Sequence, residues 1–154
     1  MKAVLSKVTG GPETLVIEDI ASPTAGPGQA LISVKAVGVN FPDVLMIEDK
    51  YQSRPPRPFS PGGELSGVIE AVGEGVTNVK VGDRVLANTG WGGMAEKVAL
   101  PANRLWHIPD SMPHDEAAAF ILTYGTSFHA LKHRGRVKAG RGASGRGRRC
   151  HRSG

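Results

Sequence analysis

The residues of this sequence that could do chemistry gather in the segment 38–83. Asn40 and Asp43 follow an apolar run, Tyr51 opens a proline-rich stretch, and the motif 61–64 introduces a second apolar run. Loops that a rigid sheet holds at strand ends are where binding and catalytic groups are commonly placed. An amide, a carboxylate and a phenol in such loops therefore predict part of an active site.

Each of these side chains also has a purely structural interpretation. Asn40 is a common turn former, Asp43 suits the negatively charged first turn of a helix, and Tyr51 beside prolines commonly packs. Glu64 is expected to be structural. The glycines that are expected to meet backbone-conformation requirements are Gly62, Gly63 and Gly67. The histidines that lack ligand spacing, and are expected at the surface or as satisfied core groups, are His107, His114, His129 and His133.

The elements that must position these residues are mostly strands. Short apolar-rich runs bounded by Gly and Pro predict strands over 2–9, 13–20, 29–39, 67–72, 83–87, 94–100 and 105–108. The first two predict a hairpin, and one or two helical turns are expected over 42–47. Spacing of about 8–12 residues between strands predicts a partly closed β-barrel. Helices are predicted over 115–122 and 126–133, so a mostly β body ends in a helical segment.

Composition limits the class of protein. A chain of 154 residues fits one domain, and its single cysteine, Cys150, cannot form an internal disulfide. We find no signal peptide and no apolar run of about 20 residues, so we expect a cytoplasmic protein without a membrane partner. The net charge of +5 comes from five arginines in the last 14 residues, while residues 1–140 are neutral. A nucleic-acid partner is therefore not expected.

The motifs resemble a known family. The matching stretches are 38–43, Tyr51 with the prolines after it, 61–69, 72–76, 82–85, 92–96 and 124–131. In this order they are similar to the N-terminal, GroES-like (alcohol dehydrogenase-like) domain of the medium-chain dehydrogenase/reductase superfamily. Within it, the zinc-independent NADPH:quinone oxidoreductase group is most similar. The resemblance implies a mostly β (α+β) fold, a partly open GroES-like barrel with short helices.

The same resemblance bears on metal binding. Zinc alcohol dehydrogenases of the superfamily place a Cys where this chain has Asn40, and a His where it has Gly63. The hydroxyl residue that relays the alcohol proton is replaced by Pro42, and residues 1–149 contain no cysteine. A tetrahedral zinc site needs such ligands. No metal site is therefore expected.

By resemblance, the reaction is hydride transfer from NADPH to a quinone or another α,β-unsaturated carbonyl compound. Asn40 and Asp43 are implied to line the nicotinamide and substrate side, and Tyr51 to donate a hydrogen bond to the acceptor or stack on it. Asn40 and Thr126 are the implied cofactor contacts. An enoyl-thioester reductase, or a non-catalytic GroES-like binding or regulatory protein, remains an alternative.

The end of the chain departs from the family. Residues 1–136 predict the substrate domain, and 137–154 a basic disordered tail where the family begins its dinucleotide-binding (Rossmann) domain. We expect a frameshift or a mis-called gene end, and a chain that is inactive alone. Without the second domain, we also expect self-association through an exposed apolar patch. The residues of that patch are Phe120, Ile121, Leu122, Phe128 and Leu131.

Overall fold

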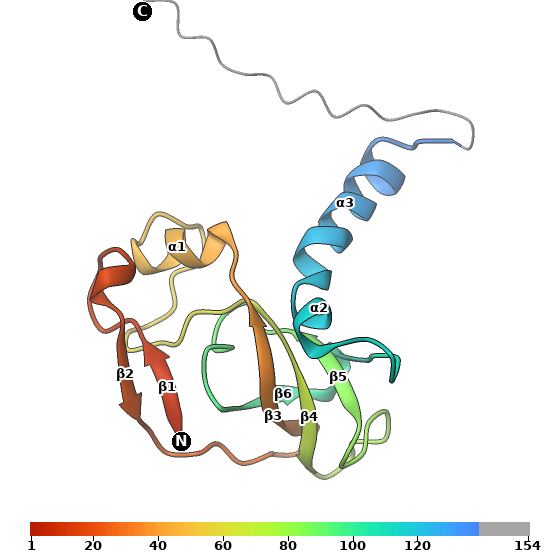
Figure 1. Cartoon of the computed structure of the whole chain (residues 1–154), viewed down its shortest axis with the longest axis horizontal. Helices are drawn as coiled ribbons and strands as arrows, with labels where there is room; N and C mark the ends of the chain where they lie inside the picture. The colour runs from red at the N-terminus through yellow and green to blue at the C-terminus, as the bar shows by residue number, and fades with distance from the viewer. Residues whose placement is uncertain (139–154) are drawn as a thin grey trace, which may run out of the picture.

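A five-stranded antiparallel sheet that curls on itself forms the body of the protein (Figure 1). This computed structural model describes residues 1–138. In order across the sheet, the strands are β6 (Lys97–Pro101), β3 (Gln29–Gly38), β4 (Glu64–Val72), β5 (Arg84–Asn88) and β7 (Leu105–His107). Since β6 and β7 are the two edges and do not pair with each other, the barrel stays open. The predicted fold class is confirmed.

A separate hairpin packs beside the sheet. It consists of β1 (Lys2–Leu5) and β2 (Val16–Asp19), with a single 3-10 turn, η1 (Pro12–Thr14), between them. The Val4 N–H donates to the Met94 carbonyl at 2.8 Å, which ties β1 to the residues before β6. The predicted hairpin is confirmed, although both of its strands are shorter than predicted.

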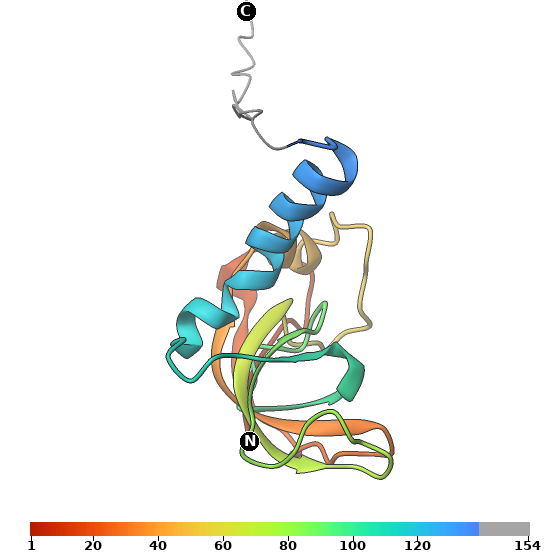
Figure 2. The ribbon, with the colours of Figure 1, turned by 90° about the vertical axis from the view of Figure 1, so that its right-hand side faces the viewer.

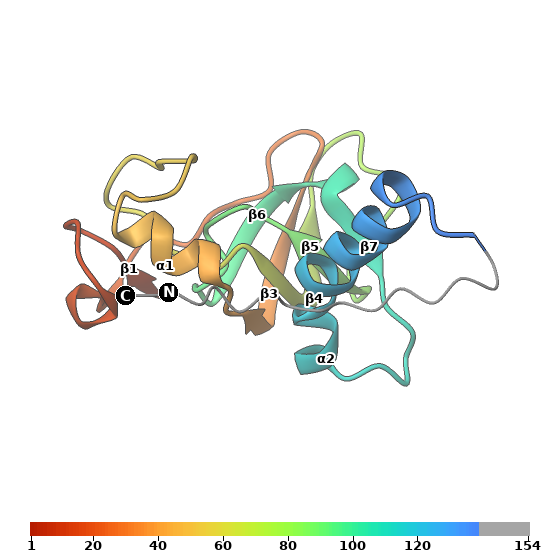
Figure 3. The same ribbon diagram turned by 90° about the horizontal axis from the view of Figure 1, so that it is seen from above.

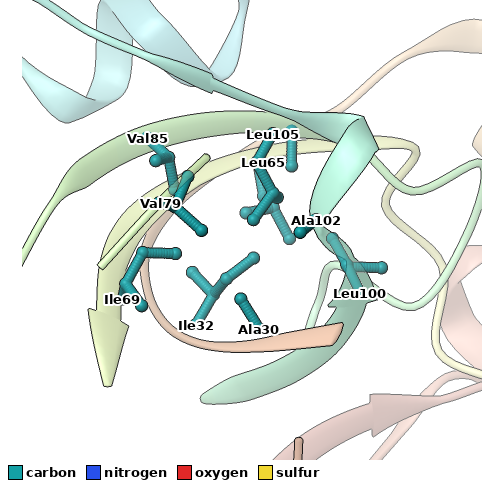
Figure 4. Packing of buried hydrophobic residues seen from close by; sticks show 10 residues of the cluster. Ala30, Ile32, Leu65, Ile69, Val79, Val85, Leu100, Ala102 and Leu105 are labelled. Carbon is teal, nitrogen blue, oxygen red and sulfur yellow. The ribbon is translucent and has the colours of Figure 1, made fainter. Parts of the chain in front are cut away.

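The main apolar core fills the inside of the curled sheet (Figure 4). Ile32, Leu65 and Val85 are fully buried there, and they come from three neighbouring strands. The full set of buried residues in this cluster is Ala30, Ile32, Leu65, Ile69, Val79, Val85, Ala87, Leu100, Ala102 and Leu105. Because side chains alternate across a strand, the intervening residues point to the outer face.

Two strands of the five-stranded sheet, β4 and β6, begin three residues away from their predicted starts. β4 begins at Glu64 rather than at residue 67, because Glu64 already pairs with Asn88 of β5. β6 begins at Lys97 rather than at residue 94, because the Met94 N–H donates instead to the Pro61 carbonyl at 2.9 Å. Residues 61–64, which we call the glycine motif, thus lie between the start of β4 and the segment that precedes β6.

The helices lie at one end of the sheet. α1 (Phe41–Ile47) follows β3, and α2 (His114–Ala118) follows the last strand, with a 3-10 turn η2 (Ala102–Arg104) before β7. Seen from above, the hairpin and α1 lie on one side of the molecule, and the C-terminal helix (residues 121–134) lies on the other (Figure 3).

The C-terminal helical segment differs from the two helices predicted. After a break at Ala119, helical turns continue through η3 (Ile121–Gly125), α3 (Thr126–Phe128) and η4 (His129–Arg134) as one rod (Figure 2). The break coincides with the Leu122 N–H, which donates to a side chain of Glu64. Within residues 1–138, no helix has the length and apolar character that crossing a membrane requires.

Candidate functional site

A cavity of about 230 Å³ lies where β4 and β5 meet α1 and the C-terminal helix. Its walls come from five separate parts of the chain, which only the fold brings together. The lining residues are Pro42, Asp43, Met46, Tyr51, Ser53, Gly63, Asn88, Gly90, Trp91 and Leu122. We call this space the acceptor cavity, after the hydride acceptor that the family resemblance leads us to expect.

Asp43 fixes one wall of the acceptor cavity. It is 3% exposed, and both of its carboxylate oxygens accept backbone hydrogen bonds. The Asn40 N–H donates to Oδ2 at 2.8 Å, and the Gly62 N–H donates to Oδ1 at 3.0 Å. The Asp43 N–H donates in turn to the Asn40 carbonyl at 3.0 Å. This carboxylate therefore locks the start of α1 against the glycine motif.

Glu64 joins three elements below the cavity. Its carboxylate is 1% exposed and accepts the Asn40 Nδ2 hydrogen bond at Oε1 and the Leu122 N–H at Oε2, both at 2.9 Å. The loop before α1, strand β4 and the C-terminal helix are linked through this one side chain. Asn40 is half-buried, and its carboxamide is held toward Glu64.

Tyr51 and Thr126 lie in different surroundings. Tyr51 is half-buried, packs against the cluster of Met46, Ile47 and Phe59, and lines the acceptor cavity. Thr126 is exposed on the C-terminal helix, four residues beyond Leu122, and is not among the residues that line the cavity. The fold therefore brings Asp43 and Tyr51 to one cavity. Asn40 is hydrogen-bonded to Glu64 and does not line this cavity, and neither does Thr126.

Asn88, Trp91 and Leu122 line the cavity but were not predicted as site residues, and Leu122 was expected in the apolar patch instead. Asn88 is the last residue of β5, and Trp91 follows it in a turn between Gly90 and Gly92, both of which have positive φ. A tryptophan between glycines in a predicted turn could have pointed to a binding site, because its large aromatic ring commonly contacts another group. Leu122 could not be found in this way, since its place depends on the break in the helix.

Gly63 corrects one prediction. Gly62 has φ +98°, as a backbone requirement predicts, but Gly63 has no positive φ. A Cβ built at Gly63 would lie 3.6 Å from Leu122 Cδ1 and 3.9 Å from Asp43 Oδ1, with nothing nearer than 3.4 Å. The missing side chain therefore keeps the cavity open instead of relieving backbone strain.

The donor set around the cavity does not resemble a metal centre. Within residues 1–138, no three His, Cys, Asp or Glu side chains are grouped as metal ligands would be. The carboxylates of Asp43 and Glu64 are both engaged by N–H donors.

A second polar cluster lies on the outer side of β4. His114 Nδ1 is 2.8 Å from Ser66 Oγ, which donates to the Val85 carbonyl at 2.9 Å, so the ring nitrogen is the donor to the serine. The Arg84 Nε–H donates to His114 Nε2 at 3.5 Å. Burial, followed by the charges of Arg84 and Lys35, lowers the pKa of His114, although Asp115 opposes them. The hydrogen bonds of His114 are thus satisfied, as predicted, and its lowered pKa favours the neutral imidazole.

The expected apolar patch is present only in part. Phe120, Phe128 and Leu131 are exposed on the C-terminal helix. In contrast, Ile121 packs against the cluster around Leu86, and Leu122 lines the acceptor cavity.

Comparison with known proteins identifies the family of this domain. Residues 26–110 match the family described as the alcohol dehydrogenase GroES-like domain. The chain belongs to this family. Among curated relatives, the quinone oxidoreductase-like protein 2 homolog of Nematostella vectensis is 42% identical over 141 residues, covering 90% of this chain and 38% of the relative. The predicted membership of the quinone oxidoreductase-like part of the medium-chain dehydrogenase/reductase superfamily is confirmed.

Solved structures agree with this GroES-like assignment. The human synaptic vesicle membrane protein VAT-1 homolog-like protein superposes with a TM-score of 0.87 at 35% identity, covering 90% of this chain and 45% of that one. The Escherichia coli quinone oxidoreductase complexed with NADPH superposes with a TM-score of 0.81 at 26% identity, covering 86% and 40%. The chain spans less than half the length of these relatives.

Residues 139–154 lie outside the described part of the chain, and with them most of the predicted tail. The predicted division at residue 136 stays a prediction.

Proposed function

We propose that this GroES-like domain forms the acceptor side of a zinc-independent, NADPH-dependent reductase of quinones or related α,β-unsaturated carbonyl compounds. The observation that carries the proposal is the acceptor cavity, in which Tyr51 and Trp91 supply aromatic walls to a space with no side chain at Gly63. Quinone reductases need a shaped, water-excluding slot with donors at the oxygen that gains charge.

The role proposed for each residue follows from whether its polar atoms already have hydrogen-bond partners. Tyr51 lines the cavity and makes no hydrogen bond through its hydroxyl within residues 1–138, so its phenol can donate to the acceptor oxygen. Asp43 has both oxygens engaged, and we assign it to positioning: it holds the wall formed by α1 and the glycine motif. Asn40 positions that loop through Glu64.

NADPH supplies the hydride in this proposal, and two NADPH-bound relatives of the fold support that assignment. Asn40 fits a position beside the nicotinamide, because it is only half-buried and already oriented by Glu64. Thr126 is exposed and available to a cofactor or a following domain. We also propose that the 154-residue chain does not oxidise NADPH by itself, since the family draws most cofactor contacts from its dinucleotide-binding domain.

Acceptor binding tests the proposal without cofactor. A Trp106→Phe, Cys150→Ser background leaves Trp91 as the single tryptophan and removes the thiol, whose thiolate would add to quinones. Titration with menadione, a neutral naphthoquinone, should quench Trp91 saturably. Tyr51→Phe should weaken binding about three- to tenfold, as loss of one hydrogen bond predicts.

The matched control is Tyr124→Phe, which removes the same hydroxyl from an exposed helical site. It should leave menadione binding unchanged. Absence of saturable quenching, or equal losses in the two variants, would contradict the proposal. Titration with a crotonyl thioester separates the alternative: tighter binding of the thioester than of menadione favours an enoyl-thioester reductase.

A further inference from the structure

A second hollow, of about 570 Å³, adjoins the acceptor cavity. Its lining residues are Asn88, Thr89, Gly90, Trp91, Arg104 and Trp106. Asn88, Gly90 and Trp91 line both spaces, so they form a shared wall. This second hollow, which we call the outer shelf, therefore lies directly beside the acceptor cavity at Trp91.

The strand register explains why bulky side chains are open to solvent on the outer shelf. β5 and β7 pair so that Ala87 lies opposite Leu105 and Leu86 lies opposite Trp106. Ala87 and Leu105 belong to the main core, so the alternation of strand side chains turns Trp106 to the outer face. Trp106 is 49% exposed and Trp91 is 43% exposed. Two indoles are thus presented to one hollow.

The outer shelf also holds polar groups that the fold does not use. Arg104 is exposed, and within residues 1–138 its guanidinium has neither a hydrogen bond nor an ion pair. By contrast, the Arg84 guanidinium donates to the carbonyls of Pro109, Asp110 and Met112. Asn88 Oδ1 accepts a hydrogen bond from the Gly90 N–H at 3.2 Å, while Asn88 Nδ2 has no hydrogen-bond partner among residues 1–138.

The residues that line the outer shelf include an arginine and no acidic side chain. Arginine recognises carboxylates and other planar oxyanions through paired N–H donors, and indole faces stack on flat rings. A ligand matching this set is aromatic and carries an anionic group. A neutral ring alone would leave the guanidinium without a partner.

We propose that the outer shelf is a specificity site for acceptors that carry an acidic group on, or next to, the conjugated ring. Arg104 binds the anionic group, Asn88 Nδ2 donates to an oxygen between the two spaces, and Trp106 stacks on the part of the ring system that reaches past Trp91. This inference rests on the proposed function for the position of the reacting ring, and adds the chemical class of the substrate.

The experiment compares two ligands with one ring system, menadione and a naphthoquinone sulfonate, in the 154-residue chain carrying Cys150→Ser. Quenching of tryptophan fluorescence, corrected for absorbance by the ligand, gives both dissociation constants. We expect the sulfonate to bind about three- to tenfold more tightly than menadione, as one solvent-accessible charged hydrogen bond predicts. Arg104→Gln should abolish the preference, so that the sulfonate binds no more tightly than menadione does to the same variant.

Two further variants localise the effect. Arg134→Gln removes an exposed arginine from the C-terminal helix, away from the outer shelf, and should preserve the preference. Trp91→Phe leaves Trp106 as the only tryptophan, which the sulfonate should quench saturably.

The outcomes separate the two proposals. A preference that survives Arg104→Gln, or one that Arg134→Gln reduces equally, overturns the outer shelf and leaves the proposed function standing if menadione still binds. Arg104-dependent binding of the sulfonate without any menadione binding supports the outer shelf and contradicts the proposed function. Absence of saturable binding by both ligands overturns both. Circular dichroism of each variant checks that the fold is retained.

Discussion

Replacing Glu64 by glutamine is the most direct way to perturb the architecture of the acceptor cavity. The carboxylate is 1% exposed and accepts two hydrogen bonds, each 2.9 Å long, from Asn40 Nδ2 and the Leu122 N–H. Glutamine keeps the shape but offers one uncharged acceptor oxygen and one NH2 group. The oxygen can accept from the Leu122 N–H, whereas Asn40 can bond to the NH2 group only if its carboxamide turns over to present Oδ1. Both hydrogen bonds to a charged acceptor are therefore replaced by weaker, uncharged ones.

The magnitude follows from these contacts. A hydrogen bond to a charged group contributes about 1.5–3 kcal/mol, and removal of the buried charge returns part of this through relief of desolvation. We expect Glu64→Gln to lower the free energy of unfolding by about 2 kcal/mol. For a domain of this size, the corresponding decrease in Tm is roughly 5–8 °C.

Urea unfolding followed by circular dichroism measures this loss. Glu70→Gln is the matched control, because Glu70 lies on the same strand, is solvent-exposed and, within residues 1–138, pairs only with Lys97. It should change stability by less than about 0.5 kcal/mol. A double-mutant cycle of Glu64→Gln with Asn40→Ala should give a coupling energy above about 0.5 kcal/mol. Unchanged or increased stability in Glu64→Gln would refute the reasoning, since desolvation would then outweigh both hydrogen bonds.

Three further predictions concern Gly63 in the acceptor cavity and the cluster of His114 and Arg84 on the outer side of β4. Gly63→Ala should fold with unchanged stability, because no atom lies within 3.4 Å of the new Cβ, but should weaken menadione binding about tenfold by narrowing the acceptor cavity. The pKa of His114 is lowered from 6.5 in the folded protein, so the unfolded chain binds the proton first as the pH falls. The free energy of unfolding should therefore decrease as pH drops below about 6.5, and His114→Gln should flatten that decrease in urea unfolding. Arg84→Lys should lower stability by about 2 kcal/mol and increase amide exchange in α2, because an ammonium cannot replace a guanidinium that donates to three carbonyls. An Arg84→Lys protein as stable as the original would show that these bonds contribute nothing net.

The strands were the most predictable part of the fold. Alternating apolar residues bounded by Gly and Pro place β3, β5 and β7 within a few residues, because burial on one face of a sheet leaves a period of two in the sequence. The start of β4 was missed because Glu64 is polar. Its burial depends on donors that are 24 and 58 residues away, which no local pattern records.

The site was predictable only where its residues are local. Asp43 and Tyr51 lie in the segment 38–83 and line the acceptor cavity, whereas Asn88, Trp91 and Leu122 come from later elements. Gly63 was noticed for the wrong physical reason, since its value is the empty space that it leaves. Helix boundaries near residue 119 were also missed, because the Leu122 N–H bonds to Glu64 instead of a helical carbonyl.

The proposed binding place of the acceptor is the cavity between α1, the glycine motif and the C-terminal helix. Titration of the isotope-labelled chain with menadione, followed by amide chemical shifts in NMR spectra, tests this directly. We expect saturable shifts at Gly63, Gly90 and Leu122, all of which line that cavity. Shifts confined to the hairpin or to the outer face of β4, with these three amides unmoved, would contradict it.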